Sequence, residues 1–288
     1  MGDYNEVAKK KLLFEHFSGV RNLVQTLEKR TQNNNAMSGK HSSERNSDSG
    51  WTGTQNLNEA FDLLEKGWED PIKDIDRGVV KNNKDLKVSA GGMKTGIVGF
   101  APCVPNAILG LPNSMMTRDQ VMRKNRVLTI GYANNSCCGT DAQDFVKGGI
   151  AICSIINRLE LSGIRVAVKA FLYSATQSRE NVFCTVDVKN WREPLDLKRV
   201  TFPLCNASWE RRIGFKYLET LPNLTDSGYS FGYGTDIMKE LNHDELHRYV
   251  VENKILDENS VYITLEDCMQ NRFDIEKIMK KFGLDKYV

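Results

Sequence analysis

The chain has 288 residues, of which 40% are hydrophobic and 26% are charged, and its formal net charge at pH 7 is +2. This length predicts one large domain or two modest ones, and the composition is that of an ordinary globular protein. Because the net charge is so small, charge alone gives no argument for binding to nucleic acid or to an anionic membrane.

The cysteines and the apolar runs indicate the compartment. The sequence has 7 cysteines and no C-x-x-C pair. An odd, dispersed set predicts free thiols in a reducing compartment. No apolar run is long enough to cross a membrane, and no long apolar stretch follows the lysines at 9–11. We therefore expect a cytoplasmic protein with no signal peptide and no membrane contact.

The N-terminal part predicts an amphipathic helix followed by a linker. Within residues 6–30, large apolar side chains recur at helical spacing at Leu13, Phe17, Val20, Val24 and Leu27. This helix could dock on its own body or on a partner. Residues 31–50 hold one apolar side chain larger than alanine, so we expect a flexible linker there.

Residues 51–125 predict a smaller, irregular α+β region. A short helix is expected over 58–67, because its apolar residues share one face and Gly67 suits a helix end. Glycines and prolines interrupt residues 86–116, which predicts short extended pieces with one helical turn at 106–109. The polar stretch 117–125 is expected to be helical.

Residues 126–288 predict an α/β domain. The apolar stretch 127–133 is typical of a buried strand, and a loop at 134–141 separates it from a long helix. Further strands are expected at 164–173, 182–189 and 261–265, and helices at 143–161, 207–219, 235–251 and 274–282. This order predicts a mostly parallel central sheet with helices on both faces.

The loop after the first of these strands is the default ligand site. Ligands of open α/β sheets bind at the carboxyl ends of the strands. The loop offers Asn134, Ser136, Thr140 and Asp141 at the start of a helix, a place that favours an anion or a carboxylate. The alternative is that Thr140 or Asp141 simply caps the helix.

Catalytic and metal-binding motifs are weak or absent. His243 and His247 in HDELH share a helix face, but no third ligand is apparent and we expect both to face water. Cys137 and Cys138 have no further ligands nearby. G-x-S-x-G, G-x-G-x-x-G and the phosphate-binding P-loop do not occur. We expect no catalytic residue, no metal and no cofactor.

Two clusters of cations predict a basic surface. One precedes the strand at 127 and the other lies on the helix near 207, beside Trp209 and Phe215. Such clusters fit a binding surface or phosphate contacts, and the alternative is a solvated helix face. The residues are Arg118, Arg123, Lys124, Arg126, Arg211 and Arg212.

The layout of residues 127–288 resembles a von Willebrand factor A-like domain. That family carries a D-x-S-x-S metal motif after its first strand, and the matching stretch here is Asn134-Asn135-Ser136-Cys137-Cys138. Only Ser136 matches. The resemblance therefore implies the fold without the metal, since a hard cation loses its charged oxygen ligand.

The chain from Trp51 onward also resembles uncharacterised proteins of bacteriophages and related mobile elements, which implies the host cytoplasm. The shared features are Trp51-x-Gly53-Thr54, Gly67-Trp68, Val104-Pro105, Gly110-x-Pro112, Met115, Glu193-Pro194-Leu195-Asp196 and Arg211-Arg212-x-Gly214-Phe215.

Together these features favour a non-catalytic scaffold or adaptor that binds a protein partner or a second copy of itself. One alternative is a nucleic-acid-associated phage replication or packaging factor that uses the basic clusters. Another is an enzyme with its site at the 134–141 loop.

Overall fold

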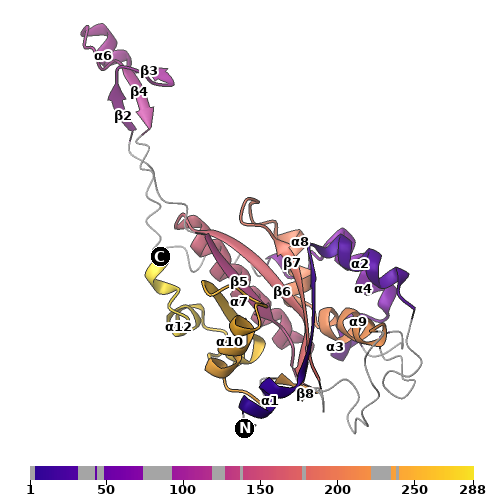
Figure 1. Cartoon of the computed structure of the whole chain (residues 1–288). Helices are drawn as coiled ribbons and strands as arrows, with labels where there is room; N and C mark the ends of the chain where they lie inside the picture. The colour runs from indigo at the N-terminus through magenta and orange to yellow at the C-terminus, as the bar shows by residue number, and fades with distance from the viewer. Residues whose placement is uncertain are drawn as a thin grey trace.

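A six-stranded mixed sheet forms the centre of the molecule (Figure 1). The computed structural model describes residues 4–31, 43, 49–73, 93–118, 127–136, 139–176, 180–221, 235–237 and 240–288. Five strands follow the order β1-β7-β6-β5-β9, and β8 pairs with β6 beside this path. The strands are β1 (Lys11–Phe17), β5 (Val127–Ala133), β6 (Arg165–Thr176), β7 (Glu180–Lys189), β8 (Thr235–Asp236) and β9 (Ser260–Thr264).

Most pairings in this sheet are parallel. β5 pairs in parallel with both β6 and β9, and β1 pairs in parallel with β7. β7 and β8 pair with β6 in the antiparallel direction. The predicted α/β architecture with a mostly parallel, helix-flanked sheet is thus confirmed. β1, β7 and β8 therefore run in the opposite direction to β5, β6 and β9, so the carboxyl ends of strands lie at both ends of the sheet.

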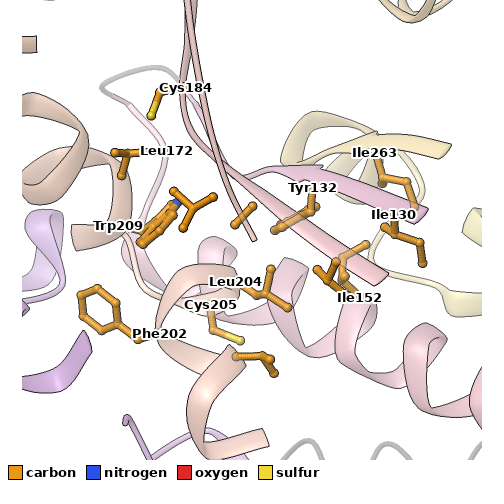
Figure 2. Close-up of a cluster of buried hydrophobic side chains, with 14 of the residues drawn as sticks. Ile130, Tyr132, Ile152, Leu172, Cys184, Phe202, Leu204, Cys205, Trp209 and Ile263 are labelled. Carbon is orange, nitrogen blue, oxygen red and sulfur yellow. The ribbon is translucent and has the colours of Figure 1, made fainter. Parts of the chain in front are cut away.

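Helices cover both faces of the sheet, because its strands bury side chains on both sides. On one face, Ile130 and Tyr132 of β5 pack with Ile152 of α7 and Trp209 (Figure 2). On the other face, Phe171 and Phe183 pack with α10. The helices of the central body are α1 (Tyr4–Lys9), α2 (Val20–Lys29), α3 (Ser49–Thr52), α4 (Leu57–Lys66), α7 (Ala142–Leu161), α8 (Leu197–Cys205), the π-helix η2 (Trp209–Gly214), α9 (Phe215–Glu219), α10 (His243–Glu252), α11 (Leu265–Gln270), α12 (Ile275–Lys281) and the 3₁₀ helix η4 (Asp285–Tyr287).

The expected single helix over 6–30 is wrong. The segment forms α1, then β1 at the edge of the central sheet, then α2. Ser18-Gly19 separates the strand from α2, since glycine is a poor helix former. Leu23, Val24 and Leu27 are buried in the main core. Of the two alternatives, the segment therefore docks on its own body.

The other predicted elements are partly confirmed. The helix predicted at 58–67 is α4, which ends at Lys66 and is followed by its C-cap residue Gly67 with a φ of 90°. Residues 117 and 118 belong to a strand, so the expected helix over 117–125 does not begin there, and residues 119–125 lie outside the described part. The expected helix over 235–251 is shorter, because Thr235–Asp236 is a strand and α10 begins at His243. Most of the expected linker at 31–50 is also outside the described residues.

Residues 93–118 form a second, smaller sheet, which we call the apolar module. Its strands β2 (Met93–Gly96), β4 (Met115–Arg118) and β3 (Ala101–Pro102) pair antiparallel in that order. Helix α6 (Val104–Ile108) lies between β3 and β4 in the chain. Figure 1 draws the module apart from the central sheet. Among the described helices of the whole chain, none is long and apolar enough to cross a membrane.

Candidate functional site

The loop predicted as the ligand site leaves the carboxyl end of β5. Asn134 follows the last residue of this strand, and Asp141 is the N-cap residue of α7. The Asp141 side chain makes no capping hydrogen bond. The Thr140 hydroxyl lies 2.5 Å from that of Ser136. The structure therefore brings the side chains of Ser136 and Thr140 together, with Asp141 exposed and Ser136 half-buried.

The inner part of this loop is closed over by the π-helix. The Glu210 carboxylate accepts from the Asn135 side chain at 3.3 Å and from the Ser136 N–H at 3.2 Å. Asn134 donates to the Pro203 carbonyl at 3.1 Å. Asn134 is 0% exposed and Thr140 is 5% exposed. The predicted ligand site is therefore closed at Asn134 and Thr140, because α8 and η2 pack against this loop.

Arg211 and Arg212 do not lie on a basic surface. Arg211 is 2% exposed and Arg212 is 0% exposed. Arg212 donates to the carbonyls of Ser43, Thr54 and Gln55 at 3.0, 3.1 and 2.7 Å. Burial lowers the pKa of the Arg212 guanidinium. The reason for the wrong prediction is that a guanidinium has five N–H donors, which can satisfy carbonyls of irregular backbone inside a protein.

The basic cluster that precedes β5 remains a prediction. Arg118 ends β4, whereas Arg123, Lys124 and Arg126 lie outside the described residues.

The first histidine of HDELH faces a buried carboxylate instead of water. His243 Nδ1 lies 3.4 Å from Asp267 Oδ2, and Lys281 Nζ lies 2.6 Å from Asp267 Oδ1. Thr264 also donates its hydroxyl to Asp267. Burial, and then the nearby His243, lower the pKa of His247. This cluster joins α10, α11 and α12. Across the described part of the chain, no group of three or more His, Cys, Asp or Glu side chains could hold a metal ion.

A groove of about 710 Å³ lies at the end of the sheet opposite to the 134–141 loop, where β1 and β7 have their carboxyl ends. Its lining mixes cations such as Arg21 and Arg199 with acids such as Glu65 and Glu193. Sequence reasoning missed it because β1 was expected to be helical.

The apolar module carries most of the exposed large hydrophobic side chains. Twelve such residues occur in the described part of the chain, and seven lie in this module. They are Ile97, Val98, Phe100, Val104, Ile108, Leu109 and Leu111, with exposures from 46% to 81%. No side chain described between Thr95 and Thr117 is buried, and this stretch has no charged residue or histidine. Its lack of charge was visible in the sequence, whereas its exposure was not.

A comparison with known protein families matches nearly the whole chain. A family model described as a domain of unknown function, DUF7192, matches residues 4–286. The chain belongs to the DUF7192 family. This DUF7192 match includes β1, the apolar module and the central sheet, so all three belong to one family domain. No curated protein and no solved structure matches.

Proposed function

We propose that this DUF7192 protein is a non-catalytic scaffold or adaptor and that the apolar module is its partner-binding element. The observation that carries the proposal is the exposure of seven large apolar side chains within one short segment. Exposed apolar surface gathered in one segment is typical of interaction sites on soluble proteins.

The energetics of the module support the same role. A small sheet needs a hydrophobic face packed against something to be stable in water. No described side chain of the module between Thr95 and Thr117 is buried. Covering one large apolar side chain contributes roughly 2 kcal/mol. A partner that covers the module would therefore supply the core that the module lacks.

The contacts of the other candidate residues favour a non-catalytic protein over an enzyme with its site at the 134–141 loop. Asn134 and Thr140 are enclosed by the fold, and Arg211 donates to internal carbonyl groups. The nucleic-acid alternative consequently loses two of its six cations and rests on Arg118 and the cations at 123–126. A steep fall of DNA or RNA affinity with salt would favour that alternative.

We further propose a bacteriophage or mobile-element origin, action in the host cytoplasm and a von Willebrand A-like central domain. The sequence resemblances support these proposals, and the parallel β5–α7–β6 unit followed by antiparallel β7 is compatible with the last one. Because Asn134 and Cys138 replace ligands of the metal motif, Mg²⁺ should not raise the melting temperature. A rise that depends on Ser136 would contradict this expectation.

The test of the binding role is a comparison of two double variants as baits in extracts of the source cells. Val98→Lys with Ile108→Lys changes the two most exposed large hydrophobic side chains of the module, at 81% and 80%. Leu161→Lys with Val288→Lys adds the same charge on the body, where exposures are 43% and 44%. The wild type and the body variant should capture the same proteins, and the module variant should lose them. Equal capture by all three baits would contradict the proposed role.

A further inference from the structure

We infer that the partner of the apolar module is a second copy of the same chain, with one module packed against the other. The inference rests on the proposed function and adds the identity of the partner.

The first step is that the described body has no other surface of this kind. Its exposed large hydrophobic side chains are fewer and lie on different elements. These are Phe14, Trp51, Val127, Leu161 and Val288, with exposures of 37% to 44%. The described part of the body therefore offers no matching patch, whereas a second copy brings an identical apolar module. Such a contact is isologous, the commonest arrangement in oligomers.

The second step concerns charge. The residues from Thr95 to Thr117 carry no charged side chain, so two modules can meet without burying a charge. Lys94 pairs in register with Thr117, and Met93 pairs with Arg118. The charged positions are thus confined to one end of the module, away from α6.

The third step argues against a lipid surface. The module is an open sheet in which β2 and β3 are edge strands. Unpaired backbone groups cost several kcal/mol each in hydrocarbon, so an open edge is not stable there. A second copy can pair such an edge. β3 has two residues and includes Pro102, which lacks an N–H, so β2 is the edge suited to pairing.

The fourth step is the area. At on the order of 100 Å² for each of the seven side chains, covering the module hides about 700 Å² per copy, close to the ~800 Å² per partner of a standard interface. The module alone therefore approaches the size that a stable dimer needs.

The experiment is light scattering and sedimentation of the purified full chain over a wide range of concentration. The wild type and the Leu161→Lys/Val288→Lys control should reach twice the 32.6 kDa of the monomer. The Val98→Lys/Ile108→Lys variant should raise the dimer dissociation constant by at least about tenfold, because it places unpaired charges in an apolar contact.

Cys103 supplies a second measurement inside the module. It is a half-buried free thiol before α6. Its alkylation rate, followed by mass spectrometry of its peptide, should fall as the wild-type concentration rises and stay constant in the module variant.

Several outcomes would overturn the inference. One is a wild type that stays monomeric with a constant Cys103 rate, and another is a dimer that survives both module substitutions. Co-sedimentation of the monomer with anionic vesicles would assign the module to lipid instead. If a monomer still captures other proteins through the module, the proposed function stands and only self-association fails. A monomer that captures nothing contradicts both.

Discussion

The guanidinium carbon of Arg211 lies 4.4 Å from the centre of the Trp51 ring. The same side chain donates to the Trp51 carbonyl at 2.5 Å and to the Thr140 carbonyl at 2.9 Å. It also lies 4.7 Å from the centre of the Phe145 ring. One buried cation thus joins α3, the 134–141 loop, α7 and η2.

Replacement of Arg211 by methionine should lower the free energy of unfolding by about 3 kcal/mol. The substitution keeps an apolar stem but leaves two carbonyl groups without this donor, and hydrogen bonds to charged groups contribute about 1.5–3 kcal/mol each. Urea denaturation followed by circular dichroism measures the loss. Arg199→Met is the control, because Arg199 is exposed and its replacement should change stability by less than about 0.5 kcal/mol. Equal stability of the two variants would show that Arg211 is not a structural link.

Asp267 should make stability depend on pH in the acid range. Burial by itself raises the pKa of this carboxyl, but His243, Lys281 and Thr264 outweigh burial and lower it from 3.8 to about 2. The folded pKa lies below the unfolded one, so the stabilisation is present above about pH 4 and is lost as the pH falls to 2. The difference of nearly two pH units corresponds to about 2 kcal/mol.

The measurement is urea denaturation of the wild type and Asp267→Asn between pH 5 and pH 2. The wild type should lose about 2 kcal/mol more than the variant over this range. Asp257→Asn changes an exposed carboxyl and should follow the wild-type curve. Parallel curves for the wild type and Asp267→Asn would mean that the cluster does not hold the carboxylate in its charged form.

Much of the central sheet could be predicted, because its strand β5 is a continuous apolar run followed by a long helix. Residues 127–133 bury side chains on both faces, and the helix after them carries its own apolar stripe. β1 could not be predicted in the same way. The spacing of Leu13 and Phe17 fits a helix, and the strand depends on the distant β7 beside which it lies. Local periodicity does not contain that long-range pairing.

The candidate site was harder to predict than the fold. The type and spacing of Arg211 and Arg212 suggested a surface, since arginine is seldom buried without partners. Their partners are carbonyl groups of residues 43, 51, 54, 55 and 140, which only the folded chain brings together. The Thr264–Asp267 capping pair follows a known local pattern. By contrast, the approach of Lys281 and His243 to Asp267 depends on tertiary packing.

The cysteines should divide into one reactive and four protected thiols among those described. Cys153, Cys184, Cys205 and Cys268 are buried, and burial raises the pKa of the last three. Because burial keeps the reagent out, and in the last three also disfavours the reactive thiolate, these four should be alkylated only on unfolding, whereas Cys103 should react in the native protein. Peptide mapping after brief alkylation separates the sites. Modification of Cys205 at the rate of Cys103 would contradict the packing of α7 against α8.

Gly149→Ala tests that packing most directly. Within a helix, alanine in place of glycine is worth about 1 kcal/mol of stability by itself. At this position, however, the new Cβ would lie 2.3 Å from Cys205 Sγ and 2.4 Å from the Leu204 carbonyl oxygen. A backbone carbonyl cannot rotate away as a side chain can, so α8 must shift, and overpacking of this kind costs about 1–3 kcal/mol. The contacts are close enough to place the cost near the upper end, which leaves a net loss of about 2 kcal/mol in thermal or urea unfolding. Gly139→Ala serves as the control, because a Cβ there meets nothing within 4 Å. If Gly149→Ala were instead more stable than the wild type, α7 and α8 would not be in contact at this glycine.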